Sequence, residues 1–281
     1  MDEGRPANEG EQPAGDIIVR CADALYQAET TRRPIQPLTR AHADLSVADA
    51  YRVQQFNVER RLSTGQRIVG HKIGLTARAM QEKFGVNEPD YGHLLDAMVL
   101  ESKVLDLGTL VDPQIEVEPA FFLGRRLKGP GVTAAEVMAA TEYVSVCFEI
   151  IDSRFVDWKV RLQDTVADNG SSARVALGAK RVKPASLVLD RLDTELELDG
   201  RVVERGNTGD ILGHPANGVA WLANYVGAFG VALEAGHIVL PGTCTRSRRI
   251  YGCRRLLGRI ADLGEISLEV IGTPAVTNTE N

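Results

Sequence analysis

Apolar residues recur at helical spacing near the start of the chain and at strand spacing after it. Residues 17–29 predict a first helix with Asp16 as its N-cap. A second helix, capped by Ser46 and ended by Gly65, carries an apolar stripe along one side. The stretch "TTRRPIQPLT" between them predicts an extended linker, because proline disfavours helix in the residue before it.

From Arg67 onward, strand-like segments dominate: "RIVGHKIGL", "QIEVEPAFFL", "YVSVCFEII", "TELELDGRVVE", "HIVLPG" and "EISLEVIG". Asp199-Gly200 is a hairpin signal between two alternating runs. Two helices interrupt the strands, one behind a capping box of Thr133 and Glu136 and one beginning at Pro215. Because helices and strands do not alternate regularly, the pattern favours an α+β domain around a rolled mixed β-sheet over a doubly wound parallel sheet.

These changes in the pattern of apolar and polar residues divide the chain into four parts. We expect a disordered tail over residues 1–15, an N-terminal helical segment over 16–66, a catalytic sheet domain over 67–273 and a flexible tail over 274–281. A chain of 281 residues can bury a sizeable core of this kind.

Composition narrows the class of protein. The formal net charge of −6 implies no general affinity for nucleic acid or membrane, and no apolar run is long enough to cross a bilayer. The N-terminus "MDEGRPANEGEQPAGD" lacks the basic and apolar regions of a signal peptide. Four scattered cysteines without a CxxC pair fit a reducing compartment, so we expect a cytoplasmic protein.

The stretch "DPQIEVEPAFFLGRR" carries Glu116 and Glu118 on one face of a predicted strand, together with Gln114. This face is either a solvated acidic surface or part of a site. Glu149 lies inside another apolar strand, where an ionised carboxylate is costly to bury without a partner. The three carboxylates could surround a divalent cation, and oxygen ligands suit Mg²⁺ or Mn²⁺. Alternatively, Glu149 pairs with an arginine such as Arg154.

Lys72 in "GHKIGLT" lies between Gly70 and Gly74 on one strand face. Flanking glycines let a ligand approach the backbone, where a lysine can bind a carboxylate, or transfer protons if burial lowers its pKa. The alternative is an exposed lysine on an edge strand. His71 points to the opposite face, which favours a structural role.

Three further stretches carry polar candidates. Asp90 in the predicted turn "VNEPDYGHLLD" is either a general base or a turn-capping side chain. The stretch "LQDTVADNGSSA", which contains Ser171, is dense in small hydrogen-bonding groups and could equally be a surface loop. His214 precedes a helix, where a structural hydrogen bond is expected.

Taken together, "GHKIGLT", "EPDYGHLLD", "QIEVEPAFFL", "FEIIDSR", "DTVADNGSS" and "GHPANGVAWLA" resemble one family. It is the family of 2-oxopent-4-enoate (2-hydroxypenta-2,4-dienoate) hydratases, of the fumarylacetoacetate hydrolase superfamily, which act in meta-cleavage degradation of aromatic compounds. The resemblance runs from the second helix to Leu240 and returns at "LGEISLEV". Six motifs in the same order make it specific.

The resemblance implies a fold, an activity and site residues. Water would add to 2-hydroxypenta-2,4-dienoate after its ketonisation, giving 4-hydroxy-2-oxopentanoate, and the substrate's carboxylate and C2 oxygens would face the cation. Family members are multimers, so a homo-oligomer is expected. By the same resemblance, the metal ligands for Mg²⁺ or Mn²⁺ are Glu116, Glu118 and Glu149, the proton-transfer pair is Lys72 and Asp90, and Ser171 binds the substrate.

Related activities compete with this one. The superfamily's 4-oxalocrotonate decarboxylases generally lack the aspartate corresponding to Asp90, and the 2-oxohept-3-enedioate hydratases usually carry a basic insertion that "SRFVDWKVRLQDT" lacks. No clear match to the His-containing motif of the C–C hydrolases is present. A different class of function is a non-catalytic subunit that binds a pathway enzyme, as in a hydratase–decarboxylase complex. The intact candidate site argues against it.

One segment departs from the family. Residues 246–259, "RSRRIYGCRRLLGR", are rich in arginine where the family continues with an alternating apolar strand. This segment either binds an acidic partner or reflects a locally shifted reading frame, and it puts strand pairing near Cys253 in doubt.

Overall fold

The computed structural model describes residues 14–77, 81–82 and 84–277, in which two β-sheets are flanked by helices on one side and along one end. No helix in this described part is long and apolar enough to span a membrane. The α-helices are α1 (Ala14–Thr31), α2 (Leu38–Ala41), α3 (Val47–Ser63), α5 (Ala134–Ala140), α6 (Leu162–Ala167) and α7 (Pro215–Gly227).

The larger sheet runs in the order β2-β1-β9-β4-β5-β6, with β10 paired to β4. The smaller sheet has the order β3-β12-β11-β7-β8. The strands of the larger sheet are β1 (Ile68–Gly74), β2 (Asp90–Leu95), β4 (Pro113–Leu123), β5 (Thr141–Asp152), β6 (Ser172–Leu177), β9 (Ile238–Leu240) and β10 (Arg248–Arg249). Those of the smaller sheet are β3 (Val104–Asp106), β7 (Asp193–Leu198), β8 (Arg201–Asn207), β11 (Arg255–Ile260) and β12 (Gly264–Ile271).

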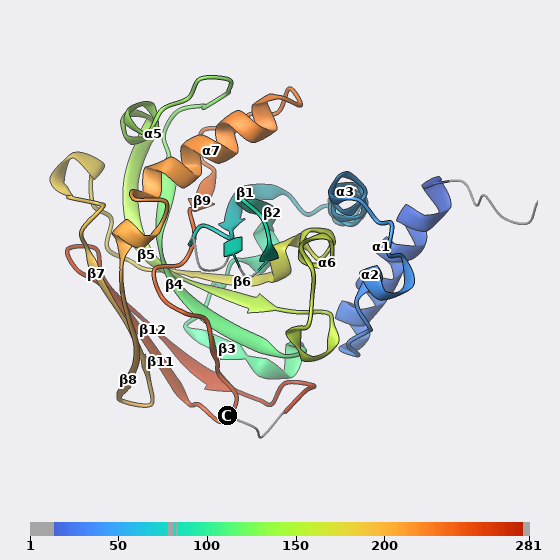
Figure 1. Ribbon diagram of the computed structural model, residues 1–281. Helices are drawn as coiled ribbons and strands as arrows, with labels where there is room; N and C mark the ends of the chain where they lie inside the picture. Colours follow the sequence, from blue (N-terminus) through green and yellow to red (C-terminus); the bar gives the residue numbers. More distant parts are fainter. Residues whose placement is uncertain (1–13, 78–80, 83, 278–281) are drawn as a thin grey trace, which may run out of the picture.

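The long strands β4 and β5 join the two sheets through one hydrophobic core. Val117 and Phe148 from the larger sheet belong to the same buried cluster as Leu256 and Leu268 from the smaller one. In Figure 1, β4 and β5 curve across the middle of the molecule. Strands β11 and β12 lie below them at the lower left, and α5 and α7 lie along the top. The α+β fold with a rolled mixed sheet is therefore confirmed.

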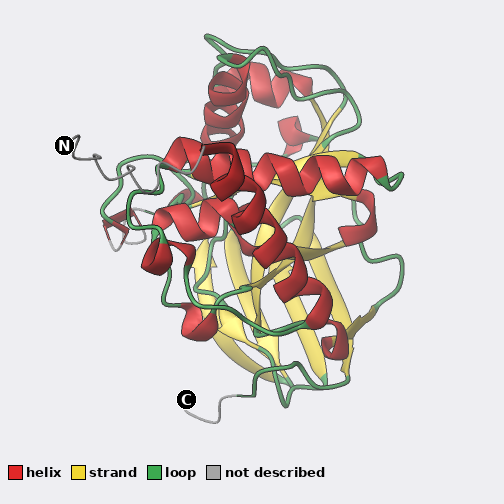
Figure 2. Ribbon diagram, turned by 90° about the vertical axis from the view of Figure 1, so that its right-hand side faces the viewer, coloured by secondary structure: helices red, strands yellow, loops and turns green. Residues whose placement is uncertain are grey.

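The N-terminal helices cover one side of the molecule, as the turned view in Figure 2 shows. Helices α1 and α3 form a second hydrophobic cluster with α6, to which Leu25, Val53 and Val166 contribute. Ser46 caps α3 as predicted, and Asp49 completes a capping box with it. The helical segment thus packs directly on the domain that carries the site.

The predictions of helix ends, turns and linkers are partly confirmed. The Thr133–Glu136 capping box, the start of α7 at Pro215 and the β7–β8 hairpin at Asp199-Gly200 form as predicted. Helix α1 begins at Ala14, so the prediction of Asp16 as its N-cap was wrong. The predicted linker, residues 30–39, is extended only in its middle, because its first two residues end α1 and its last two begin the short helix α2. Most of the predicted N-terminal tail and the last four residues lie outside the described residues.

Strands β10 and β11 form within the arginine-rich segment, with a turn between them, which contradicts the doubt about its pairing. Strand β11 pairs with β12 on one side and with β7 on the other. A Cβ at Gly258 would lie 2.6 Å from Phe148 Cε1, so the glycine allows the sheets to approach. Several arginines of the segment form ion pairs. Arg246 and Arg248 pair with Glu204, Arg249 pairs with Asp112, and Arg259 pairs with Glu197. A shifted reading frame is not needed to explain this segment.

Candidate active site

Three glutamates converge at the middle of the larger sheet. Glu116 and Glu118 lie on β4, and the register places Glu116 directly opposite Glu149 on β5. Antiparallel partners point to the same face, so each of the three offers a carboxylate oxygen within 4.8 Å of the other two. Glu118 and Glu149 are 1% and 0% exposed. The solvated acidic face considered from the sequence is therefore wrong.

These carboxylates lack enough hydrogen-bond donors. Within the described residues, neither carboxylate oxygen of Glu149 accepts a hydrogen bond of regular geometry, nor does Oε1 of Glu118, although Lys72 and the Ser172 hydroxyl lie near enough to Glu149 to lower its pKa. Glu118 Oε2 accepts a 2.9 Å bond from the Gly242 N–H. Burial and then repulsion by Glu149 raise the pKa of Glu116 to about 8, and burial likewise raises the pKa of the other two. An all-oxygen acidic set with so few hydrogen-bond donors fits a divalent cation.

Lys72 is buried beside this cluster, on a strand that is paired on both sides. Its Nζ lies 3.6 Å from Glu149 Oε1, and its side chain is 6% exposed. In the strand order, β1 and β5 are three spacings apart, about 14 Å in a flat sheet, so the sheet must curl to bring these atoms together. Burial lowers the pKa of Lys72, but Glu149 and the neighbouring carboxylates outweigh burial and raise it. Lys72 is therefore a buried cation, and the exposed edge lysine is excluded.

Asp90 faces Lys72 from the adjoining strand. It is the first residue of β2 and pairs with Gly74, so its placement in a turn was wrong. A Cβ at Gly74 would lie 2.1 Å from Asp90 Oδ1 and 3.5 Å from Lys72 Nζ. The glycine therefore makes room for the carboxylate of Asp90, rather than for a ligand as we expected. Burial raises the pKa of Asp90, and Lys72 opposes that rise.

Ser171 reaches the same site on a left-handed loop, the 3₁₀ turn η4 (Asn169–Ser171). Asn169, Gly170 and Ser171 have φ of 56°, 61° and 56°, a conformation that non-glycine residues adopt only when their surroundings hold them. The Asn169 side chain provides that hold by bonding both the N–H and the C=O of His93. A Cβ at Gly170 would lie 3.1 Å from Lys72 Cδ, so η4 packs against the lysine.

A cavity of about 940 Å³, including its open mouth, joins these residues. Lys72, Asp90, Glu116 and Ser171 line it, while Glu118 and Glu149 lie behind Glu116 and Lys72. Five of the six predicted site residues are buried, and Glu116 is partly buried. All six converge on one region from β1, β2, β4, β5 and η4. The positions agree with the prediction, whereas the chemical roles remain predictions.

Other polar candidates lie away from the cavity. His71 is buried on the opposite face, near the rings of His93 and His237. His214 caps α7 by accepting the Ala216 N–H at Nδ1, as expected. Arg154 pairs with Asp168 and not with Glu149, so the alternative partner for Glu149 was wrong.

Several residues that line the active-site cavity had no site role predicted from the sequence. Gln114 shares the glutamate face, and its Oε1 accepts a 2.7 Å bond from Ser247 of the arginine-rich segment. The alternation along the predicted strand had placed Gln114 on this face, but nothing in the sequence gave it a role. Trp158 ends a short 3₁₀ turn, Val156–Trp158, and Val160 follows it; these elements are too short to give a periodic signal.

A rolled α+β fold with a triad of glutamates beside a cavity defines the chain as a candidate divalent-metal enzyme. The family model described as "Fumarylacetoacetate (FAA) hydrolase C-terminal" matches residues 99–279. A 2-hydroxypent-2,4-dienoate hydratase of Pseudomonas putida is 45% identical over 218 residues, which are 77% of this chain and 98% of that protein. The chain therefore belongs to the fumarylacetoacetate hydrolase superfamily, in the family that contains this hydratase.

Two other relatives indicate the breadth of the group. A 2-oxo-hept-4-ene-1,7-dioate hydratase of Escherichia coli is 40% identical over 80% of this chain and 87% of its own. The solved structure of 4-oxalocrotonate decarboxylase from Pseudomonas putida G7, complexed with magnesium and adipate, has a TM-score of 0.88. It is 33% identical and covers 93% of this chain and all of its own. The predicted family is confirmed.

Proposed function

We propose that the chain is a hydro-lyase that converts 2-hydroxypenta-2,4-dienoate, the enol of 2-oxopent-4-enoate, into 4-hydroxy-2-oxopentanoate. The observation that carries the proposal is the triad of glutamates beside Lys72, with two of the three buried and three of their oxygens without a hydrogen bond from the described residues. The relative that bears this activity in its name is 45% identical and is matched over nearly its full length. The pathway context, meta-cleavage degradation of aromatic compounds, is inferred with the activity.

Glu116, Glu118 and Glu149 would hold the cation, which we propose to be Mg²⁺ or Mn²⁺ because all the ligand atoms are carboxylate oxygens. When bound, such an ion supplies Lewis-acid stabilisation of the negative charge that develops on the substrate's C2 oxygen. The Gly242 N–H fixes one Glu118 oxygen and leaves the other free to bind.

Lys72 and Asp90 would carry the protons. In the ketonisation, the C2 hydroxyl loses a proton and C5 gains one, which leaves the remaining double bond between C3 and C4. The oxygen of water then bonds to C4 while C3 gains a proton. Neighbouring carboxylates keep Lys72 protonated, which suits a donor, and the raised pKa of Asp90 suits an acceptor. The Ser171 hydroxyl would hydrogen-bond the substrate.

The rest of the cavity supports a substrate with one carboxylate. Ile151, Trp158 and Val160 form an apolar part of its wall, and among the described lining residues Lys72 is the one cation. A second carboxylate, as in a heptenedioate, would therefore lack a basic partner within the described lining. The heptenedioate hydratase activity is the second candidate because of the 40% identical relative.

A spectroscopic assay tests the proposed function. The dienoate absorbance should disappear with the protein and Mg²⁺ or Mn²⁺, and should persist when a chelator is present. Product analysis then separates a hydroxy-oxo acid, the proposed result, from released CO₂, which would indicate a decarboxylase. If the absorbance persists with either ion, the chain is instead the non-catalytic partner of a pathway enzyme.

Two further properties belong to the proposal. We infer a cytoplasmic homo-oligomer, in agreement with four described cysteines that are all free thiols and with exposed apolar side chains after α7. Phe229 and Val231 are 71% and 48% exposed, which suits a contact between subunits. Light scattering of the purified chain measures the subunit number.

A further inference from the structure

The arginine-rich segment, residues 246–259, brings one side chain into the active-site cavity. Ser247 lines that cavity together with Gln114, and its hydroxyl donates a 2.7 Å hydrogen bond to Gln114 Oε1. Neither residue is one of the six proposed active-site residues. The proposed hydration reaction therefore leaves this hydrogen-bonded pair without a role.

The arginines on either side of Ser247 anchor it. Arg246 and Arg248 both pair with Glu204, whose side chain is only 5% exposed. Because that carboxylate is buried, water and salt screen these pairs less than pairs on the open surface. Strand β10 begins at Arg248 and pairs with β4, so the main chain after Ser247 is held as well. Ser247 therefore reaches the cavity from a segment that ion pairs and strand pairing fix in place.

The hydrogen bond from Ser247 sets the orientation of the Gln114 amide. An amide has an acceptor oxygen at one end and two N–H donors at the other. Since the Ser247 hydroxyl faces Oε1, the Nε2 atom of Gln114 takes the opposite side, where it donates to none of the described residues. This atom is not sealed in the interior, and Gln114 lines the cavity. The amide thus offers two N–H donors to a ligand.

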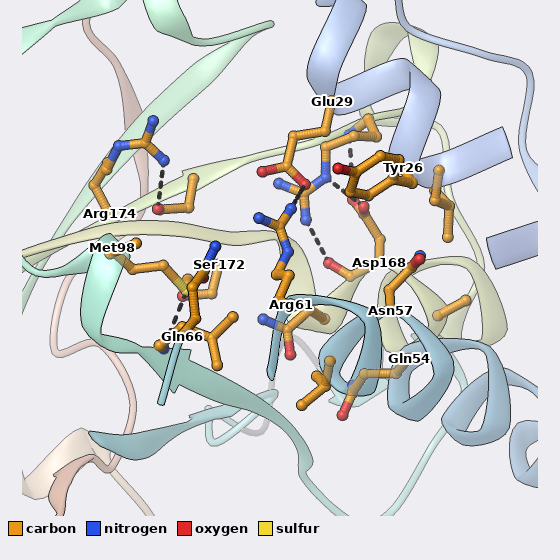
Figure 3. Close-up of a pocket in the computed structure, with 18 residues that line it drawn as sticks. Tyr26, Glu29, Gln54, Asn57, Arg61, Gln66, Met98, Asp168, Ser172 and Arg174 are labelled. Carbon is orange, nitrogen blue, oxygen red and sulfur yellow. Dashed lines mark hydrogen bonds and ion pairs between the residues drawn. The ribbon is translucent and has the colours of Figure 1, made fainter. Parts of the chain in front are cut away.

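Two hydroxyl groups that line the cavity already have acceptors for their hydrogens. Ser171 donates to Asp168 Oδ2 at 3.3 Å, and Thr243 donates to a carbonyl of its own loop at 3.0 Å. Figure 3 shows Asp168 in a separate cavity, between the N-terminal helices and the sheet domain, where Arg154 pairs with it. Neither hydroxyl can donate to a ligand without giving up its bond, whereas Gln114 can.

Gln114 is also close to the proposed cation site. It precedes Glu116 by two residues on the same face of β4, which separates the two positions by about 6.5 Å along the strand. By the proposed function, the substrate's C2 oxygen and one of its carboxylate oxygens face the cation. The second carboxylate oxygen then needs a hydrogen-bond donor from the protein.

We propose that Gln114 is a substrate-binding residue, whose amide N–H donates to the second oxygen of the substrate's carboxylate. Ser247 is its positioning residue, because the hydroxyl fixes which end of the amide faces the cavity. The arginine-rich segment thereby takes part in recognising the 2-oxo acid end of the substrate. This inference rests on the proposed function, since the three glutamates place that end of the substrate.

Calorimetric titration of the full chain with pyruvate, in saturating Mn²⁺, tests the contact. Pyruvate has the carboxylate and the 2-oxo group of the substrate but no tail and no double bond to hydrate. We expect binding that chelator abolishes, and a loss of about tenfold or more in affinity in Gln114→Ala, as for a hydrogen bond to a charged group. The affinity for Mn²⁺ itself should not change. Gln55→Ala, which removes an exposed amide on α3, is the matched control and should bind pyruvate as the wild type does.

A double-mutant cycle tests the role of Ser247. Ser247→Ala should weaken pyruvate binding by about two- to tenfold, because the amide is then free to turn, and Ser247→Thr should restore binding by keeping the hydroxyl. Added to Gln114→Ala, Ser247→Ala should cost no further affinity, since it acts through the amide. A full additional loss in the double variant would show that Ser247 does not act through Gln114.

The dienoate assay reports on the proposed function independently of this titration. If the wild type hydrates the dienoate and Gln114→Ala binds pyruvate equally well, the Gln114 contact alone is wrong. If the wild type neither turns over nor binds pyruvate, both proposals are wrong. Weaker Mn²⁺ binding in Gln114→Ala would indicate damage to the cation site and would also overturn the contact. If circular dichroism shows that Gln114→Ala is unfolded, Gln114→Met, which keeps the length but has no N–H, replaces it with the same expected loss.

Discussion

At the scale of single residues, the glutamate cluster destabilises the folded protein when no cation is bound. Three carboxylate oxygens lie within 4.8 Å of one another in a buried place, and like charges at this distance repel strongly where water is excluded. Lys72 offsets part of this charge but stands 3.6 Å from one glutamate oxygen. The arrangement therefore makes sense as a site that a dication completes.

Glu116→Gln should abolish metal-dependent turnover and keep the fold. Replacing one ligand oxygen by an amide removes a charge that the cation needs, and we expect a loss of about 100-fold or more in kcat/KM, since even groups behind the ligands cost 10–100-fold. Steady-state kinetics with saturating Mn²⁺ measures the loss, and circular dichroism checks the fold. Full activity would remove Glu116 from the metal site.

The metal-free protein should lose stability as the pH rises. Burial and repulsion raise the pKa of folded Glu116 to about 8, so the folded state binds more protons than the unfolded chain between about pH 4.5 and 8. The stabilisation from that proton is complete below the unfolded pKa and is lost as the pH rises through 8. Thermal unfolding with chelator should show this fall, and Glu116→Gln should reduce it. A melting temperature independent of pH in this range would contradict the raised pKa.

Lys72→Met should lower kcat and leave binding of the cation intact. The change removes the proposed proton donor but no ligand oxygen, so the expected loss is about 10²–10⁴-fold, the range of general acid catalysis. Kinetics at saturating substrate and Mn²⁺ gives the effect on kcat, and calorimetric titration with Mn²⁺ checks the site. Turnover at the wild-type rate would exclude a chemical role for Lys72.

At the scale of elements, the strand pair β1–β2 places the proposed acid and base. Gly74→Ala puts a methyl group 2.1 Å from Asp90 Oδ1, so the Asp90 carboxylate must leave its position beside the glycine. We expect turnover to fall by about tenfold or more, because small misplacements of catalytic groups are costly. Gly15→Ala in α1, where no atom lies within 4 Å of the new methyl group, is the control and should retain full activity. Equal activities would show that Asp90 needs no exact position.

Strand β11 tests whether the arginine-rich segment is a true part of the core. Leu256 on this strand is 0% exposed, so Leu256→Ala should cost about 2–5 kcal/mol of unfolding free energy. Arg254→Ala, at an exposed position just before the strand, should change it by no more than about 0.5 kcal/mol. Denaturant unfolding measures both. A negligible effect of Leu256→Ala would mean that the segment does not form the paired strand.

At the scale of the whole molecule, local patterns predicted elements better than they predicted their assembly. Alternation revealed β4 and β5, and capping signals revealed α3, α5 and α7, because both depend on neighbours in the sequence. Strands β2 and β11 were missed, since Asp90 follows a proline and the arginines of β11 hide its buried leucines. Their pairing depends on distant partners that no local pattern records.

In the active site, too, local spacing predicted part of the arrangement and the tertiary structure determined the rest. The spacing of Glu116 and Glu118 predicted a shared face, but no spacing relates either of them to Lys72, which reaches them only because the sheet curls. Resemblance to a family supplied that link. Nothing in the sequence predicted the cavity between the N-terminal helices and the sheet domain, because α1, α3 and β6 contribute to it from separate parts of the chain.

The central claim is that Glu116, Glu118 and Glu149 together hold one divalent cation. A crystal structure of the chain grown with Mn²⁺, with anomalous scattering recorded for manganese, tests it most directly. The account predicts one anomalous peak about 2.0–2.3 Å from an oxygen of each glutamate, as for small hard dications. Three carboxylates turned apart, with no peak between them, would contradict it.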